Sequence, residues 1–182
     1  VIGKLGFGYE QCKAINPRII FASVSGFGQY GPYHDRPGYD LIAQAMGGSM
    51  SITGWPGQDP TRAGMAIGDM MAGMNCCMGV LASLIKREKT GVGQQVDVAL
   101  VDTIVSGLEA KCMQYLYTGK APEKTGNKYI TSAPYDSFKA KDTYFVIASG
   151  TDKHFIHFSK AIGKPELADD PLYCNTELRK KN

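Results

Sequence analysis

The sequence predicts an α/β protein that begins with a Rossmann-like parallel sheet flanked by helices and continues into the start of a small α+β domain. The apolar run Arg18–Ser25 is typical of a strand buried on both faces of a parallel sheet. Gln95–Ala99 alternates and predicts a second, short strand. Between 119 and 134 the composition shifts to Gly, Pro, Lys and Thr. We therefore expect a large domain over 1–118, a linker over 119–134 and a small domain from 135–182.

A loop and a short helix follow the first strand. Residues 26–38 contain four glycines and two prolines, so we expect a loop at the carboxyl edge of the sheet. In open α/β sheets, ligands bind at that edge. Residues 39–46 predict a short helix, which Gly47 and Gly48 end before an irregular stretch.

A long apolar helix comes next, and Asp69 is expected to cap it. The helix should end near Lys89, because cations fill its last turn and Gly91 follows. Its run from 70 to 85 is short for a membrane span and includes Asn75 and Ser83, so we interpret it as a buried core helix. We expect no membrane partner.

The rest of the chain continues the alternation of strands and helices. Apolar residues recur at helical spacing from 101 to 116, which predicts a helix after the second strand. Thr143–Ser149 predicts a strand and Asp152–Ile162 a helix. These last two elements would open the small domain.

Composition narrows the class of protein. The formal net charge of +3 is too balanced to indicate a nucleic-acid surface, although small anions remain possible partners. Five cysteines without zinc-like spacing favour a reducing, cytoplasmic setting. The sequence starts without Met, and we expect it to be a piece of a longer polypeptide.

Two familiar patterns carry little weight here. Gly26, Gly28 and Gly31 form a literal GxGxxG, yet Pro32 follows at once, and the dinucleotide fingerprint needs a helix there. A nicotinamide oxidoreductase therefore stays a minor alternative. His154 and His157 lie three apart on the predicted helix without a third ligand nearby, so we expect no metal site.

Asp69 combines three features that favour chemistry. Gly68 should leave room for a substrate, the helix start supplies unpaired N–H groups, and the helix dipole favours the anionic carboxylate. An ionised, reachable carboxylate is a potential nucleophile. Position alone nevertheless favours capping, because Asp is a common helix cap.

A family resemblance changes that balance. The segments NPRIIFASVSGFGQYGPYHDRPGYDLIAQAMGG, GDMMAG and LASLIKREKTGVGQQVDVALVD resemble the class III coenzyme A transferases, the formyl-CoA transferase, carnitine CoA-transferase and CaiB/BaiF-like family. APYDSFKAKDTYFVIASGTDKHF and GKPELADDP resemble the start of its small domain. Complete members are longer than this chain, so the resemblance implies a fragment.

The resemblance implies CoA transfer between an acyl-CoA and a free carboxylic acid, with Asp69 as the covalent nucleophile. Lys4 and Arg36 would lie near the CoA phosphates; the alternative for Lys4 is a merely solvated lysine beside a loop, and the alternative for Arg36 is a surface ion-pair residue. Tyr39 and Gly68 would line the substrate site, where the alternative for Tyr39 is a core aromatic. Coenzyme A is then a substrate, and no tightly bound cofactor is expected. An interlocked homodimer is implied.

Two related functions stay open. The α-methylacyl-CoA racemases look similar but place a His in the segment of Tyr39, and a phenol with a pKa near 10 is a poor base for proton abstraction. That difference favours the transferase. A non-catalytic CoA-binding fragment is the other alternative.

Overall fold

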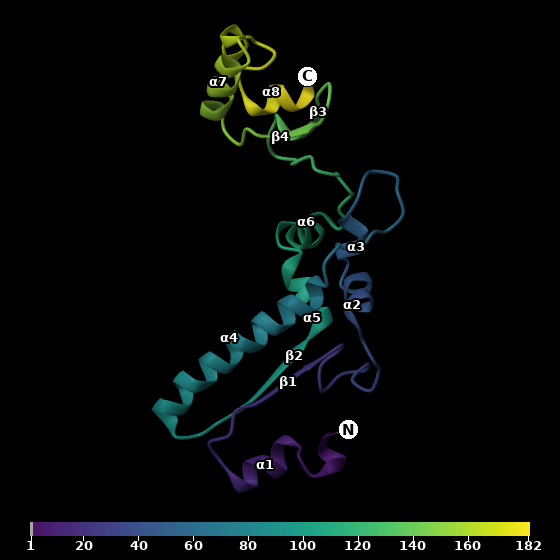
Figure 1. Cartoon of the computed structure of the whole chain (residues 1–182), viewed down its shortest axis with the longest axis vertical. Helices are drawn as coiled ribbons and strands as arrows, with labels where there is room; N and C mark the ends of the chain where they lie inside the picture. The colour runs from purple at the N-terminus through teal and green to yellow at the C-terminus, as the bar shows by residue number, and fades with distance from the viewer. Residues whose placement is uncertain (1) are drawn as a thin grey trace. The chain divides into compact units, whose positions relative to one another are not determined.

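The computed structural model describes residues 2–182 and divides the chain into two compact units (Figure 1). Unit 1 comprises Val1–Thr53 and Pro60–Glu123, and unit 2 comprises Gly54–Asp59 and Lys124–Asn182. The boundary after Glu123 falls inside the segment 119–134. The α/β fold class is confirmed, because a parallel sheet with helices is followed by an antiparallel sheet with helices.

The sheet of unit 1 pairs two strands that lie far apart in the sequence. Strand β1 (Phe21–Ser25) runs parallel to β2 (Gln95–Ala99), with Phe21 opposite Gln95. The first strand was expected from Arg18, but the ladder begins three residues later because its partner begins only at Gln95. The expectation that this strand is buried on both faces is also wrong for this chain, since alternate residues of β1 are exposed.

The helices of unit 1 depart from expectation at several places. Its helical elements are η1 (Ile2–Leu5), α1 (Tyr9–Ile15), α2 (Asp40–Met46), α3 (Ser49–Ile52), α4 (Ile67–Thr90), α5 (Leu100–Gly107) and α6 (Ala110–Thr118). The stretch expected to be irregular contains α3. The single helix expected after β2 is broken into α5 and α6 at Glu109, whose φ of 48° is incompatible with a continuous helix.

Helix α4 begins earlier than the sequence predicted. Its N-cap is Ala66, with no side-chain capping bond, and Asp69 is the third helical residue. The expectation that Asp69 caps the helix is therefore wrong. The predicted end is confirmed, since Gly91 adopts a left-handed φ of 75° and donates its N–H to the Arg87 carbonyl.

The core of unit 1 lies where α2, α4 and α5 meet. It is built from Ala43, Ala72, Leu100 and Ile104. Small residues allow this close approach: a Cβ added to Gly47 would lie 2.5 Å from Cγ2 of Ile104. This packing holds the beginning of α4 against α2.

The rest of α4 is more exposed than a core helix. Its fully buried positions include Ala72 and Ser83, on the side that contacts β1, β2, α2 and α5. The opposite side carries large apolar side chains that are more than half exposed: Met70, Met74, Met78, Leu81 and Ile85. The expectation of a buried core helix is therefore wrong for this chain, because one side of α4 is exposed. Within residues 2–182, α4 alone has the length and hydropathy of a membrane span, but its buried side packs on protein.

Unit 2 is a hairpin packed with helices (Figure 1). Strand β3 (Tyr135–Lys139) pairs antiparallel with β4 (Tyr144–Ala148), and α7 (Asp152–Ala161), η2 (Pro165–Ala168) and α8 (Thr176–Lys181) follow. The predicted strand at β4 and helix at α7 are confirmed, whereas β3 was not predicted. A cavity of about 420 Å³ lies between these elements, lined in part by Tyr135, Phe155 and Tyr173.

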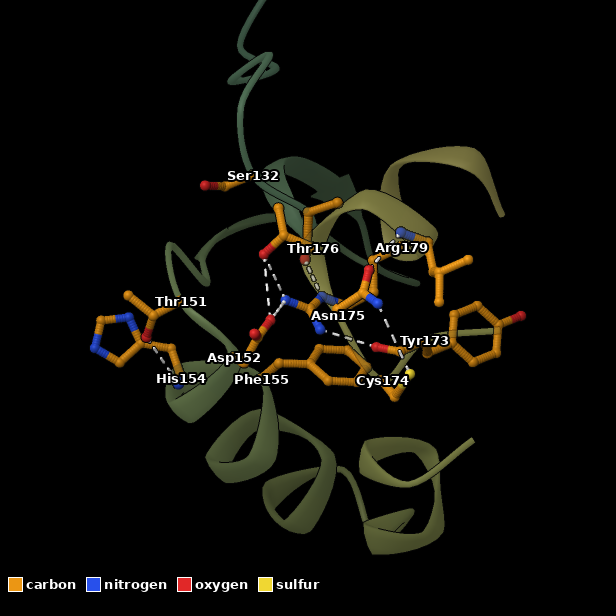
Figure 2. Close-up of polar contacts among 12 residues, drawn as sticks. Ser132, Thr151, Asp152, His154, Phe155, Tyr173, Cys174, Asn175, Thr176 and Arg179 are labelled. Carbon is orange, nitrogen blue, oxygen red and sulfur yellow. Dashed lines mark hydrogen bonds and ion pairs between the residues drawn. The ribbon is translucent and has the colours of Figure 1, made fainter. Parts of the chain in front are cut away.

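A buried arginine organises unit 2 (Figure 2). The Arg179 side chain is 2% exposed and donates to the backbone carbonyls of Ala133 and Tyr173, each at 2.8 Å. It also pairs with the carboxylate of Asp152 and lies over the ring of Phe155. One side chain therefore joins the segment before β3, the start of α7 and the segment before α8.

Candidate active site at the start of helix α4

The Asp69 side chain is exposed in the first turn of α4. No hydrogen bond to its carboxylate or to its backbone N–H is found within residues 2–182. The free N–H of Asp69 and the helix dipole create positive potential at this end of α4. The carboxylate is thus approachable, as nucleophilic chemistry requires.

A buried hydrogen-bond relay holds the backbone beside Asp69. The Gly68 N–H donates to Oδ1 of Asp40 at 2.8 Å, and Nε2 of Gln44 donates to Oδ2 of the same carboxylate at 2.8 Å. Oε1 of Gln44 accepts the N–H of Ala63 at 2.8 Å. The relay therefore ties α2 to both ends of the segment from 63 to 68.

Sequence reasoning missed Asp40 and Gln44 as members of this site. Asp40 is 9% exposed and Gln44 is fully buried. One signal was present: Asp and Gln at positions i and i+4 of a predicted helix lie on one face and can bond. Their contact with residues far along the chain carries no local signal.

Gly68 is a packing residue in this structure. Its Cα faces the interior, where an added Cβ would lie 3.1 Å from Oδ1 of Asp40, 3.5 Å from Cβ of Ala43 and 3.6 Å from Cδ1 of Ile104. The space beside Gly68 that was expected to admit a substrate is filled by protein. The small side is needed for α4 to approach α2 and α5.

Tyr39 lies next to this relay in the chain. It is the N-cap of α2, its carbonyl accepts the N–H of Ala43, and its side chain is 79% exposed. The alternative of a core aromatic is therefore wrong for the described chain. The bond from Gly68 to Asp40 brings the dipeptide of Tyr39 and Asp40 beside that of Gly68 and Asp69.

The two predicted phosphate ligands lie on other segments of unit 1. Arg36 is exposed in the loop after β1, and its guanidinium carbon lies 4.2 Å from the centroid of the Tyr33 ring. No ion pair of Arg36 is present in the described part of the chain, so the ion-pair alternative is not seen. Lys4 is exposed in η1. Their binding of CoA stays a prediction.

The glycine-rich loop follows the carboxyl end of β1 and is hydrogen-bonded to both strands. No helix occurs between β1 and Tyr39, so the GxGxxG offers no helix start to a pyrophosphate, as predicted. Instead, Gly28 has a φ of 86° and donates to Oγ of Ser25, while the Gln29 N–H donates to Oδ2 of Asp97 on β2. These bonds fold the loop back over the sheet edge.

The histidines show no metal-binding arrangement. His154 and His157 are exposed on α7, and the N–H of His154 donates to Oγ1 of Thr151, the N-cap. Among residues 2–182 no group of three or more His, Cys, Asp or Glu side chains has the geometry to hold a metal ion.

The fold and site together define an α/β domain that presents an exposed carboxylate in the first turn of a helix packed on a parallel sheet. The sequence pattern of "CoA-transferase family III" matches residues 1–182. The chain therefore belongs to CoA-transferase family III.

Two relatives show the range of the family. The chain is 43% identical to the acetyl-CoA:oxalate CoA-transferase of Acetobacter aceti, over 100% of this chain and 47% of that protein. It is 36% identical to the succinyl-CoA:glutarate CoA-transferase of Homo sapiens, over 100% of this chain and 41% of that protein. The chain thus spans less than half the length of these curated relatives.

Solved structures agree with this assignment. The crystal structure of a CAIB/BAIF family protein from Brucella suis is 40% identical, with a TM-score of 0.83. The similarity covers 100% of this chain and 48% of that protein. The predicted resemblance to the class III transferases is confirmed.

Proposed function

We propose that the protein carrying this chain transfers coenzyme A between an acyl-CoA thioester and a free carboxylic acid, with Asp69 as the nucleophile. The exposed carboxylate in the first turn of α4, free of hydrogen bonds within residues 2–182, is the observation that carries this proposal. Membership of the family and the names of the relatives support the reaction class.

The first half of the reaction removes the donor acid. An oxygen of the Asp69 carboxylate attacks the thioester carbonyl, the carbon–sulfur bond breaks, and CoA leaves as a thiolate, giving a mixed anhydride. The thiolate then attacks the Asp69 carbonyl of the anhydride. The donor carboxylate leaves, and Asp69 carries CoA as an aspartyl thioester.

The second half reverses these steps with the acceptor. The acceptor carboxylate attacks the aspartyl thioester, releasing the CoA thiolate and forming a second anhydride. The thiolate attacks the acceptor acyl carbon, which breaks its bond to the bridging oxygen. That oxygen stays on Asp69, the acceptor leaves as its CoA thioester, and the enzyme is regenerated.

Several groups of this chain have roles in the proposal. Each attack develops an oxyanion, and the N–H of Asp69 in the first turn of α4 stabilises it because it is already oriented. The N–H of Asp69 has no acceptor within the described residues, whereas that of Gly68 is occupied by Asp40. Lys4 and Arg36 are proposed to bind the CoA phosphates, and Tyr39 to contact the acyl group.

The substrates are proposed to be short carboxylic acids. The relatives' names include acetyl-CoA and oxalate in one case, and succinyl-CoA with glutarate or D-citramalate in others. We therefore propose acetyl-CoA or succinyl-CoA as donor and a short dicarboxylic acid as acceptor. A screen of such acids with both donors, in the full polypeptide that carries this chain, identifies the pair.

Oxygen transfer to Asp69 tests the mechanism directly. Turnover with an acceptor labelled with ¹⁸O in its carboxylate should place ¹⁸O in the tryptic peptide that contains Asp69. Hydroxylamine added during incubation with acyl-CoA should convert Asp69 to a hydroxamate. Active enzyme with neither label nor hydroxamate at Asp69 would refute the covalent role.

Variants separate this proposal from the two alternatives. Asp69→Asn should abolish exchange of CoA between acids and leave CoA binding intact, while Asp142→Asn, an exposed control in the β3–β4 turn, should change neither. A racemase would exchange the substrate α-hydrogen with deuterated water and transfer no CoA. A CoA-binding module would gain thermal stability with CoA but show no exchange.

A homodimer is part of the proposal, because the family resemblance implies it. Light scattering of the purified full polypeptide measures the mass of the assembly. A monomer that exchanges CoA would contradict this part and leave the chemistry intact.

A further inference from the structure

Asp40 is a buried carboxylate for which the proposed mechanism has no use. Asp40 is 9% exposed. Its Oδ1 accepts the Gly68 N–H and its Oδ2 accepts a hydrogen bond from Nε2 of Gln44, each at 2.8 Å. An ionised carboxylate is costly to bury unless hydrogen bonds compensate it. Its placement against the residue before Asp69 therefore calls for a specific role.

The relay fixes the backbone from which Asp69 projects. Ala63 and Gly68 are held at the two ends of the loop that enters α4, one by Gln44 and the other by Asp40. Both anchoring side chains come from α2, which packs against α4 and α5 through Ala43 and Ile104. The first turn of α4 is thus hydrogen-bonded to a neighbouring helix that packs into the core of unit 1.

The same bond decides which amide of the first turn is available. The N–H groups of a first helical turn lack partners within the helix, and here Oδ1 of Asp40 takes that of Gly68. The N–H of Asp69 has no acceptor within residues 2–182. Asp40 therefore leaves the amide of the nucleophile itself as the nearest free donor.

We infer that Asp40 is a positioning residue for Asp69, acting through its hydrogen bond to the Gly68 N–H and held in place by Gln44. This inference rests on the proposed function, because it concerns the reactivity of Asp69. Asp40 touches no reacting atom. It sets the direction of the Asp69 side chain and the free amide beside it.

Moving the carboxylate from position 40 to position 44 tests the role of these hydrogen bonds while keeping the same groups in place. In Asp40→Asn, the amide oxygen can still accept the Gly68 N–H, but the amide NH₂ then faces the NH₂ of Gln44, so two donors meet. If the Gln44 amide is flipped, its NH₂ faces the Ala63 N–H instead, and two donors meet there. In Gln44→Glu, two carboxylates face each other. When both substitutions are combined, the amide introduced on the first side chain donates to the carboxylate introduced on the second. The amide oxygen still accepts the Gly68 N–H, and the second oxygen of the new carboxylate accepts the Ala63 N–H. All three hydrogen bonds are therefore restored.

The expected kinetics follow from geometry. Asp40→Asn should lower kcat for CoA exchange by about 10- to 100-fold, because small displacements of a nucleophile cost that much, with KM for the acyl-CoA changed by less than about twofold. The double variant should recover to within about threefold of wild type. Hydrogen exchange of the peptide over 63–69 should rise in Asp40→Asn and return to the wild-type rate in the double variant.

The outcomes distinguish the two proposals. If wild type exchanges no CoA and forms no Asp69 hydroxamate, the proposed function fails. If wild type is active and Asp40→Asn retains its kcat, the positioning role fails. A double variant that folds, as judged by circular dichroism, but stays as slow as Asp40→Asn also overturns it. Asp142→Asn is the Asp-to-Asn control, expected to match wild type.

Discussion

Replacing Arg179 by Met should destabilise unit 2 severely. The side chain is 2% exposed, so Met can occupy the apolar part of the space, but it offers no donors. The carbonyls of Ala133 and Tyr173 would lose their partners at 2.8 Å. A hydrogen bond from a charged donor contributes about 1.5–3 kcal/mol, and the loss of two sets the scale of the effect.

The other contacts of Arg179 add less. The side chain of Asp152 is 57% exposed, so solvent screens the ion pair and its share is about 0–1 kcal/mol. The cation–π contact with Phe155 contributes about 0.5–2 kcal/mol. Since these terms share one side chain and are not additive, we expect a loss of about 3–4 kcal/mol in the free energy of unfolding. For a domain of this size, that lowers Tm by roughly 12–32 °C.

Hydrogen–deuterium exchange with thermal circular dichroism checks this expectation. Peptides from 144 to 162 should exchange faster in Arg179→Met, whereas peptides from α4 should keep the wild-type rate. Arg179→Lys keeps the charge but loses the planar fork, so an intermediate loss is expected. Lys180→Met is the neighbouring control, since Lys180 pairs only with Glu177 within the described residues. Arg179→Met within about 1 kcal/mol of wild type would refute the reasoning.

Three further predictions concern single side chains. The hydrogen bond from Arg179 lowers the pKa of Asp152 below its ordinary 3.8. The stabilisation that this gives is complete at pH values above 3.8 and is lost as the pH falls through the lowered pKa of the folded state. Asp152→Asn should therefore remove this part of the acid dependence of Tm. A Cβ on Gly79 would lie 2.7 Å from the opposing β2 side chain, so Gly79→Ala should lower the free energy of unfolding by about 1–2 kcal/mol. A Cβ on Gly73 of the same helix meets open space, so Gly73→Ala should raise it by about 1 kcal/mol. Urea unfolding measures both changes. Ser83→Ala should cost about 1–2 kcal/mol in the same assay, because buried Oγ of Ser83 donates to Gly79 and accepts from Gln94, both at 2.6 Å; equal stability of Ser83→Ala and wild type would contradict it.

Local signals in the sequence located much of this fold. Gln95–Ala99 was predicted with the observed bounds, and the end of α4 at Gly91 followed from a glycine after a cationic turn. Both depend on neighbours in the chain, on alternation in one case and on a left-handed φ in the other. The start of α4 was missed because Ala66 carries no capping side chain.

Pairing between distant segments set the limits of prediction. Strand β1 was expected three residues too long, because only the position of β2 shows where a ladder can begin. Strand β3 was not predicted, since its hairpin partner supplies the bonds that define it. Exposure of the outer side of α4 likewise depends on which elements of this chain pack against it.

By itself the sequence determined that a carboxylate stands at the head of a long helix, in a motif resembling that of the CoA-transferases. Tertiary structure decided what surrounds that carboxylate. Asp40 lies 28 residues from Gly68 along the chain, yet their bond holds the backbone of the nucleophile. Helical periodicity and capping act over a few residues, whereas such a bond forms only after α2, α4 and α5 have packed together.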